Sequence, residues 1–471
     1  MSDAWVVGAG PNGLAGAVEL QRSGLSVTVL EAAEEIGGGT RTSELTVPGV
    51  LHDHCSAVHP MATASPFMRS LDLERHGLEW RWPQVYLAHP LDDGTAAVMV
   101  RSIETTAQGL GPDGAAWKRL FGGPSKKFES LLPDLMQPML HVPRHPLRLM
   151  RFGVPALAPA TLVAKAWKGE HAKALFGGVA AHAFSPLTMP LSSSVGMALT
   201  CAGHAFGWPV ARGGSRAITD ALAAELSGRG GTIETGRRVD SLDELPRGDV
   251  VLLDLSPARV IDVAGPRLDA RVARAYRRYK HGPGAFKVDF AVEGGVPWQD
   301  EACRRAGTVH AVGSFAETVE AEADTNRGRM PARPFVLVGQ QYLADPDRSE
   351  GDVHPVWAYA HVPNGWLGDE TEAVIGQIER FAPGFRKRIV AQVSKGPREF
   401  EDYNSNYIGG DIIGGANNPL QIAVRPRIGL SPYSTGIPGV YICSASTPPG
   451  AGVHGMNGSN AARAALAALH Q

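Results

Sequence analysis

The sequence predicts an α/β fold in which a doubly wound parallel sheet is assembled from separate stretches of the chain, with a second, α+β domain inserted between them. Three observations carry this prediction. An apolar strand at residues 5–7 runs into a glycine-rich turn and a helical segment. The run at residues 249–255 is apolar enough for a buried parallel strand. A strand at residues 440–443 leads into another glycine-rich loop and an alanine-rich helix.

The first glycine-rich turn has the pattern of a dinucleotide-binding βαβ unit. Its G-x-G-x-x-G glycines are Gly8, Gly10 and Gly13, and a second strand, residues 25–30, ends at Glu31. Gly8 permits the tight turn, Gly10 lets the backbone approach a pyrophosphate, and Gly13 lets helix and strand pack closely. The helix N-terminus presents free N–H groups and a partial positive charge to that phosphate. Glu31 can accept hydrogen bonds from both ribose hydroxyls, and its carboxylate disfavours a 2′-phosphate.

The segment after Glu31 distinguishes a flavin site from a nicotinamide site. Residues 37–42 read G-G-G-T-R-T. An acid followed at this spacing by G-G-x-x-R resembles the glutathione-reductase-type FAD proteins, in the branch that holds amine oxidases and phytoene desaturases. The resemblance implies that the backbone at Gly38 and Gly39 approaches the second phosphate, where Arg41 adds a fixed positive charge.

The C-terminal strand, glycine loop and helix form a second anion-binding arrangement. With FAD in the first site, this helix points its positive end at the N1–C2=O edge of the flavin and stabilises the negative charge of the reduced ring. Flavoproteins of this type often carry an aspartate after this strand. Here Ser444, Ala445 and Ser446 occupy that place.

Over its whole length the chain resembles the phytoene desaturase-like flavoproteins, most closely the group named for a pyridine nucleotide-disulfide oxidoreductase domain. The matching stretches are VVGAGPNGLAGAVEL, EIGGGTRT, GWPVARGGSRAITDAL, GPGAFKVDFA and YICSASTPPGAGVHGMNGSNAA. The resemblance implies a discontinuous glutathione-reductase-type FAD-binding Rossmann domain over residues 1–65, 207–265 and 425–471. The inserted α+β substrate domain, with a helical lid, then spans residues 66–206 and 266–424.

The resemblance also assigns positions around the cofactor. Val239 contacts the adenine end through its backbone, and Ser56 and Ala57 fall beside the isoalloxazine. The residues expected to contact FAD are Gly8, Gly10, Pro11, Asn12, Gly13, Glu31, Ala32, Gly38, Gly39, Thr40, Arg41, Ser56, Ala57, Val239, Ser444, Gly452, Val453 and Met456.

Few residues have the pattern of a catalytic group. His454, inside the C-terminal glycine loop, is the first candidate acid or base, and a packed histidine is the alternative. The run His52-Asp53-His54-Cys55 suggests a metal cluster, but strand alternation divides its side chains between two faces, so we expect no metal. Candidate polar groups of the pocket are Gln340, Gln341, Tyr342, Tyr359, His361, Asn404, Asn406, Asp411, Arg425 and Arg427.

Composition narrows the functional class. The chain has 471 residues, a net charge of −2 and 44% hydrophobic residues, which describes a globular protein and gives no electrostatic footprint for nucleic acid. The four cysteines form no C-x-x-C pair, so we expect free thiols, no disulfide chemistry and a cytoplasmic location. The first strand begins too early to leave room for a signal peptide.

The stretch at residues 112–207 is helical by spacing, apolar and cut by prolines. It is either a lid over a lipophilic site or an ordinary helical core. Its segment 133–164 carries basic residues that can face anionic lipid, so peripheral membrane contact is an open alternative to a solvated basic face. The oligomeric state is open as well.

These observations predict an FAD-dependent oxidoreductase that desaturates or oxidises a lipophilic or mid-sized organic substrate by hydride transfer to the flavin N5. Two alternatives use the same fold: a non-redox binding protein resembling the Rab escort proteins, and a flavin-dependent isomerase. Intact glycines together with Glu31 and Arg41 argue against the first alternative. The electron acceptor, oxygen or a quinone, stays open.

Overall fold

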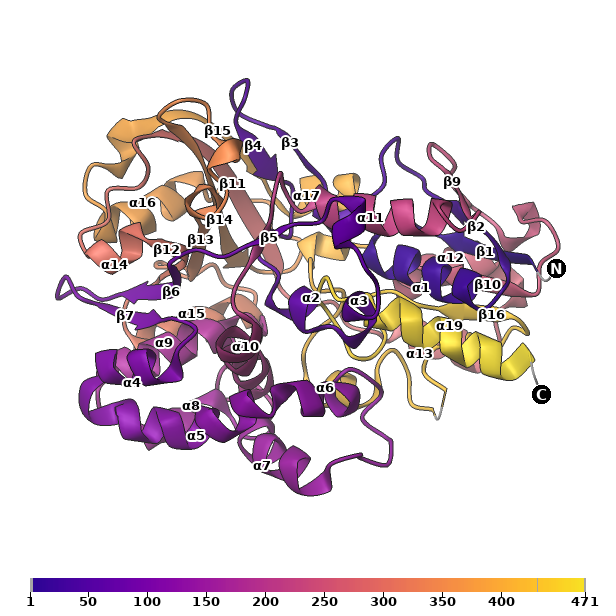
Figure 1. Ribbon diagram of the computed structural model, residues 1–471, viewed down its shortest axis with the longest axis horizontal. Helices are drawn as coiled ribbons and strands as arrows, with labels where there is room; N and C mark the ends of the chain where they lie inside the picture. Colours follow the sequence, from indigo (N-terminus) through magenta and orange to yellow (C-terminus); the bar gives the residue numbers. More distant parts are fainter. Residues whose placement is uncertain (1–2, 430, 470–471) are drawn as a thin grey trace.

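A computed structural model describes residues 3–429 and 431–469 and has two large sheets (Figure 1). The first sheet has the strand order β16-β10-β1-β2-β9, and all its neighbouring strands are parallel. Its strands are β1 (Asp3–Val7), β2 (Ser26–Leu30), β9 (Thr232–Glu234), β10 (Val250–Leu253) and β16 (Val440–Ile442). The strands come from both ends and the middle of the chain, as the glycine motifs predict, and the expected mixed α/β architecture is confirmed.

Helices cover both faces of this parallel sheet. Val6 and Val29 pack on one face in a core shared with α1 (Pro11–Arg22), α11 (Arg216–Ser227) and α19 (Met456–Leu469). The alternate residues Val7 and Leu30 pack on the other face, against α12 (Pro257–Ala264) and α13 (Ala270–Arg277). Because successive side chains of a strand point to opposite faces, the two cores establish a doubly wound sheet.

The second sheet has seven strands in the order β15-β11-β14-β13-β12-β6-β7. Its strands are β6 (Val85–Pro90), β7 (Ala96–Met99), β11 (Gly284–Glu293), β12 (Ala306–Ala311), β13 (Val336–Gly339), β14 (Val353–Val362) and β15 (Ile389–Lys395). The neighbouring strands β11, β14 and β13 are antiparallel. The sheet as a whole is not, because β6 joins it parallel to β12. A separate two-residue strand, β5 (Trp80–Arg81), precedes β6.

A layer of helices lies below the second sheet in Figure 1. Its members are α4 (Ile103–Gly109), α5 (Gly114–Lys126), α6 (Phe128–Leu135), α7 (Pro146–Leu157), α8 (Ala160–Val163), α9 (Glu170–Ala181) and α10 (Ser193–Phe206). The helical character of this stretch is as expected, but Pro133 and Pro155 lie within α6 and α7 and do not separate helices. Both prolines lie in the C-terminal halves of their helices, and α7 continues only to Leu157.

Shorter elements connect these layers. They are β3 (Thr42–Glu44), β4 (Leu51–Asp53), β8 (Val210–Ala211), α2 (Pro60–Ala64), α3 (Pro66–Arg69), α14 (Glu301–Arg304), α15 (Phe315–Asn326), α16 (Thr371–Phe381), α17 (Pro397–Tyr403) and α18 (Pro419–Val424). The strands β3 and β4 pair antiparallel in a short hairpin. The strands β5 and β8, which precede and follow the helical layer in the sequence, pair with each other in antiparallel orientation.

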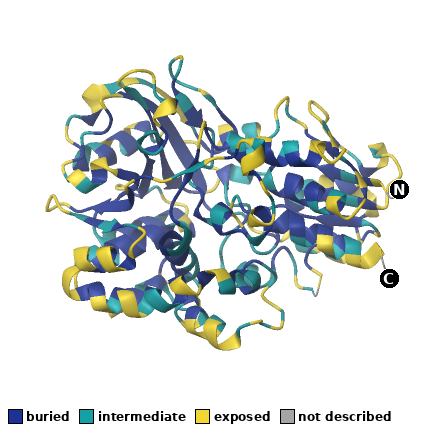
Figure 2. Cartoon of the chain, in the orientation of Figure 1, coloured by how far each residue is buried: buried dark blue, intermediate teal, exposed yellow. Residues whose placement is uncertain are grey.

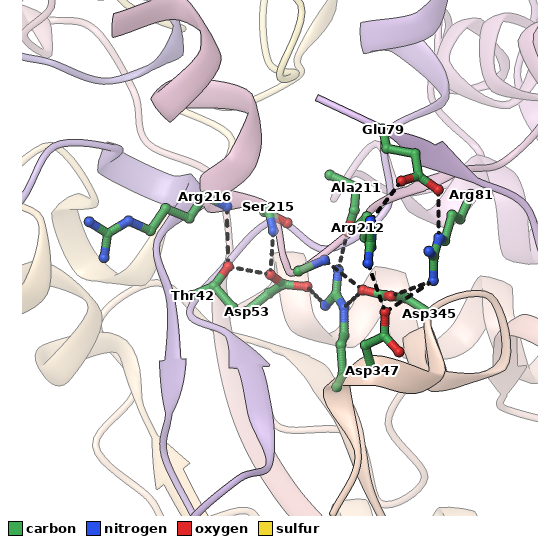
Figure 3. A network of polar contacts seen from close by, with 12 residues as sticks. Thr42, Asp53, Glu79, Arg81, Ala211, Arg212, Ser215, Arg216, Asp345 and Asp347 are labelled. Carbon is green, nitrogen blue, oxygen red and sulfur yellow. Dashed lines mark hydrogen bonds and ion pairs between the residues drawn. The ribbon is translucent and has the colours of Figure 1, made fainter. Parts of the chain in front are cut away.

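A buried ionic network joins distant parts of the chain (Figure 3). The guanidinium of Arg348, 1% exposed, lies 2.5 Å from a carboxylate oxygen of Asp53 and 3.0 Å from one of Asp345. It also donates to the Ala211 carbonyl at 2.7 Å. The second oxygen of Asp53 accepts from the backbone N–H of Ser215 at 2.7 Å, just before α11. The network thus links the β3–β4 hairpin, the N-terminus of α11 and the loop before β14.

Candidate functional site

A cavity of about 1150 Å³ lies between the two large sheets. The carboxyl ends of β1, β2 and β10 contribute Gly8, Glu31 and Asp254, and the second sheet contributes Leu337 and Trp357. The carboxyl ends of parallel strands are where α/β sheets bind ligands. The volume slightly exceeds the range of about 300–1,000 Å³ typical of small-molecule sites, so it has room for a dinucleotide with a further small molecule.

Two glycine turns meet at one end of the cavity. A Cβ atom on Gly38 would lie 3.1 Å from the Cα of Gly10, so side chains are excluded where the two turns approach. Gly10 is also the N-cap of α1, and Pro11 is its first residue. A bare backbone at a helix N-terminus suits a phosphate group. This end of the cavity therefore fits the pyrophosphate of a dinucleotide.

The acid at the end of β2 is held at the cavity wall. Glu31 accepts hydrogen bonds from the backbone N–H groups of Ala9 at 2.8 Å and Ala33 at 3.0 Å. Arg41 lies 3.5 Å from the same carboxylate and is fixed by the Glu35 carbonyl at 2.7 Å. The expected acid and cation thus sit together, and the cations Arg237, Arg238 and Arg259 also line this end.

Every residue expected to contact FAD lines the cavity except Gly13 and Met456. The packing role expected for Gly13 has a direct cause, since a Cβ there would lie 1.9 Å from the Gly8 carbonyl oxygen. Its N–H donates to Asp254 at 3.0 Å. The N–H of Met456 donates to the His454 ring at 3.1 Å. Both amides are therefore engaged by side chains of the chain itself.

His454, the first candidate acid or base, does not line the cavity, although its neighbours Gly452 and Val453 do. The residue is 2% exposed, its Nδ1 accepts from Met456 at the start of α19, and its carbonyl accepts from Ser65. Burial lowers the pKa of His454 to about 4. The ring is therefore a neutral cap on the C-terminal helix, the packed histidine that the sequence left as an alternative.

The structure adds Asp254 to the site, a residue that the sequence marks only as part of an apolar strand. Its carboxylate accepts from Gly13 at the start of α1, and a Cβ on Gly10 would lie 2.9 Å from one of its oxygens. Burial raises the pKa of Asp254 to about 7, although the Gly13 hydrogen bond opposes the shift. A titratable group thus lies at the helix terminus that suits an anion.

The side chains of the histidine-rich run that begins within β4 contact other parts of the chain. His52 Nε2 lies 2.8 Å from the Thr46 hydroxyl, and His54 Nε2 lies 2.7 Å from the Ser43 hydroxyl. Asp53 belongs to the Arg348 network. Within residues 3–429 and 431–469 no group of three or more ligand side chains is arranged to hold a metal ion.

Aromatic side chains form the other end of the cavity. The rings of Trp357 and Tyr359 lie 5.0 Å apart, and Phe184 stacks on Tyr359 at 6.0 Å. Trp208 and Tyr407 also line the cavity. Of these five only Tyr359 could be named from the sequence, because Phe184, Trp208 and Tyr407 lie in three separate loops and Trp357 has no motif around it on β14.

One imidazole faces this aromatic end. His182 lines the cavity, and its Nε2 lies 3.0 Å from the Nε2 of His310. Burial lowers the pKa of His182 to about 3, so both rings are neutral at pH 7 and one donates to the other. Of the candidate polar groups, Tyr359, Asn404, Asn406 and Arg425 line the cavity; Gln340, Gln341, Tyr342, His361, Asp411 and Arg427 do not.

Comparisons with known proteins agree with this geometry. Residues 6–72 match the NAD(P)-binding Rossmann-like domain. The chain is 24% identical to pyridine nucleotide-disulfide oxidoreductase domain-containing protein 2 of Rattus norvegicus, over 96% of this chain and 91% of the rat protein. This relative belongs to the group that the sequence motifs resemble.

Two solved structures share the fold over almost the entire chain. An oxidoreductase from Methanosarcina mazei has a TM-score of 0.65 at 14% identity, with 99% of this chain and 100% of that chain covered. Cyclohexylamine oxidase from Brevibacterium oxydans has a TM-score of 0.57 at 15% identity, with 100% of both chains covered. Residues 6–72 are therefore similar to NAD(P)-binding Rossmann-like domains, and the whole chain shares its fold with these two solved oxidoreductases.

Proposed function

We propose that the chain is an FAD-dependent oxidoreductase that desaturates or oxidises a lipophilic or mid-sized organic substrate by hydride transfer to the flavin. One observation carries the proposal: a single cavity joins a glycine-lined dinucleotide cradle to an aromatic pocket. The names of the similar proteins, an oxidoreductase and an amine oxidase among them, support the same class.

The residues at each end of the cavity suit FAD. The turns at Gly10 and Gly38 would hold its pyrophosphate and Glu31 its adenosine ribose, and Ser56 and Ala57 would flank its ring. Bound FAD would supply the two-electron acceptor for a C–H or C–N bond.

The aromatic end can hold and desolvate a substrate. Trp357, Tyr359 and Phe184 offer apolar ring faces and exclude water, which favours transfer of a hydride over side reactions. His182 offers a neutral imidazole to a polar atom of the substrate, and its contact with His310 fixes the ring. Because its pKa is lowered to about 3, this imidazole stays neutral at pH 7 and serves as a hydrogen-bonding partner for the substrate.

The test is anaerobic reduction of the flavin in the purified protein. We expect the protein to carry bound FAD, and its oxidised absorbance to disappear on addition of one member of a panel that contains cyclic amines, diamines and apolar polyunsaturated compounds. Readmitted oxygen or a quinone should restore the absorbance. A colourless protein whose melting temperature is unchanged by added FAD would refute the proposal. Turnover only with pre-reduced flavin, without consumption of an acceptor, would indicate an isomerase.

Asp254 should make the affinity for FAD depend on pH. Ionisation of Asp254 above about pH 7 places a negative charge beside the pyrophosphate position. We expect the Kd for FAD to rise by about tenfold between pH 6 and pH 8, because like charges at short distance repel. In Asp254→Asn this rise should disappear, since the amide oxygen still accepts from Gly13 but carries no charge. Fluorescence titration of the flavin-free wild type and of flavin-free Asp254→Asn at pH 6 and pH 8 measures the Kd for FAD in each case.

The control for this experiment is a second aspartate, which lies next to the opposite end of β10. Asp249 is exposed and immediately precedes β10, at the end opposite Asp254. Asp249→Asn removes the same formal charge far from the cavity and should keep the pH dependence of the wild type. Equal pH profiles for the wild type and Asp254→Asn would contradict the assigned role.

A further inference from the structure

The helical layer carries a concentrated apolar surface. Eight of the fifteen exposed large apolar side chains among the described residues lie in the 24 positions between Met139 and Leu162. They are Met139, Leu140, Val142, Leu147, Met150, Val154, Leu157 and Leu162, and we call this set the apolar patch. Single exposed apolar residues are ordinary, whereas a contiguous group marks an interaction surface.

The geometry of α7 gives the patch a defined face. Leu147, Met150, Val154 and Leu157 recur at intervals of three, four and three residues, so they share one side of the helix. Leu147 is 76% exposed and Val154 is 66% exposed, while Phe152 points inward. The same helix forms an outer edge of the molecule in Figures 1 and 2, where it is largely exposed. Its outward face is therefore apolar where a water-facing helix would be polar.

A buried acid holds the loop before α7 in place. Asp134 is 3% exposed and accepts hydrogen bonds from the backbone N–H groups of Arg144 at 2.9 Å and His145 at 3.3 Å. The loop between α6 and α7 thus closes on a fixed point and presents Leu140 and Val142 outward, at 68% and 91% exposure. The patch is preformed, which lowers the ordering cost of an interaction.

The charges around the patch select its partner. Residues 135–169 contain no aspartate or glutamate. They contain five exposed cations: Arg144, Arg148, Arg151, Lys165 and Lys168. An apolar helix face flanked by cations matches the chemistry of an anionic lipid surface. A second copy of the chain fits poorly, because a two-fold contact would bring these cations together without an acid to pair with them.

We propose that this surface docks the protein on anionic membranes, with the α7 face inserted among the lipids and the flanking cations on the headgroups. No single helix in the described part of the chain is long and apolar enough to cross a bilayer; α7 and the segment 160–166 meet the length and composition criteria only as a pair, bent by 102°. α10 packs against α7 and lines the cavity through Ser194, Val195 and Leu199. Docking therefore brings a wall of the cavity within one helix layer of the lipid.

The test is flotation of the full-length protein with vesicles of phosphatidylcholine alone or mixed with phosphatidylserine. We expect binding to the mixed vesicles, weakened by salt. The triple variant Leu147→Ser, Met150→Ser, Val154→Ser should bind at least about a hundredfold more weakly, because the inserted apolar side chains are lost. The variant Arg144→Gln, Arg148→Gln, Arg151→Gln should lose about a hundredfold on mixed vesicles.

Matched controls separate the patch from general surface effects. The variant Leu367→Ser, Leu420→Ser, Ile428→Ser removes exposed apolar side chains elsewhere, and Arg271→Gln, Arg274→Gln, Arg277→Gln removes three exposed arginines of α13. Both should bind as the wild type does. Absence of flotation, equal binding to phosphatidylcholine alone, or unchanged binding of either patch variant would overturn the proposal. So would a dimer in size-exclusion chromatography that the apolar variant dissociates and that does not bind vesicles.

Discussion

Arg348→Met is expected to lower the free energy of unfolding by about 3–5 kcal/mol, since it leaves two buried carboxylates without their shared cation. Asp53 and Asp345 are both fully buried, and Arg348 lies between them. Methionine fills much of the volume of the arginine stem, so the loss is electrostatic more than steric. Urea denaturation at pH 8 measures the change.

The pH dependence of this loss identifies its cause. In the wild type, burial acts to raise the pKa of Asp53, but the Arg348 charge and hydrogen bonds outweigh it and hold that pKa below its usual value. The ionised carboxyl thus stabilises the fold above the unfolded pKa, and this contribution disappears as the pH falls through the lowered one. In the variant, burial is unopposed by the cation, so Asp53 destabilises the fold as the pH rises through its new, higher pKa. The difference between the two proteins should therefore be larger at pH 8 than at pH 5.

Arg212→Met is the control from the same network. The Arg212 side chain is 52% exposed and pairs with Glu79 and Asp347 at the surface (Figure 3). Exposed pairs contribute about 0–1 kcal/mol, so this variant should unfold close to the wild type. If Arg348→Met proved as stable as Arg212→Met at pH 8, the buried network would not be what stabilises the contact between the β3–β4 hairpin, the start of α11 and the loop before β14.

The features that the sequence predicted correctly are local ones. Gly8, Gly10 and Glu31 are recognisable because one βαβ unit places all three within a short stretch, and their spacing follows from strand and helix geometry. The parallel sheet could be predicted for the same reason, since each of its main strands carries its own apolar run and turn. The two motifs at the chain ends then meet in one cavity.

The features that the sequence did not reveal depend on contacts between distant segments. His182 and His310 are 128 positions apart, and neither stands in a motif. In the sequence Asp53 stands out only as part of a histidine-rich run that suggests a metal cluster. Its ion-pair partner Arg348 lies 295 positions away. His454 is a further case, because a histidine in a glycine-rich loop gives no sign in the sequence that its ring caps the next helix. Only the tertiary structure supplies these partners.

Gly13→Ala should remove FAD binding and destabilise the protein. The added Cβ would lie 1.9 Å from the carbonyl oxygen of Gly8, and a backbone atom cannot rotate away as a side chain can. The turn between β1 and α1 must therefore open, which moves Gly10 and the helix N-terminus from the pyrophosphate position. We expect the affinity for FAD to fall at least about a hundredfold, and the free energy of unfolding of the flavin-free protein to fall by about 1–3 kcal/mol, as overpacking does elsewhere.

Flavin content after purification, fluorescence titration and urea denaturation measure these effects, and Gly376→Ala provides the matched control. Gly376 is an exposed glycine inside α16, and a Cβ there meets no atom within 4 Å. The same substitution should raise the free energy of unfolding by about 0.5–1 kcal/mol, because alanine favours a helix interior over glycine. A Gly13→Ala protein that kept its flavin would mean that α1 can shift without disturbing the cradle. The close approach of the two glycine turns would then not be what positions the cofactor.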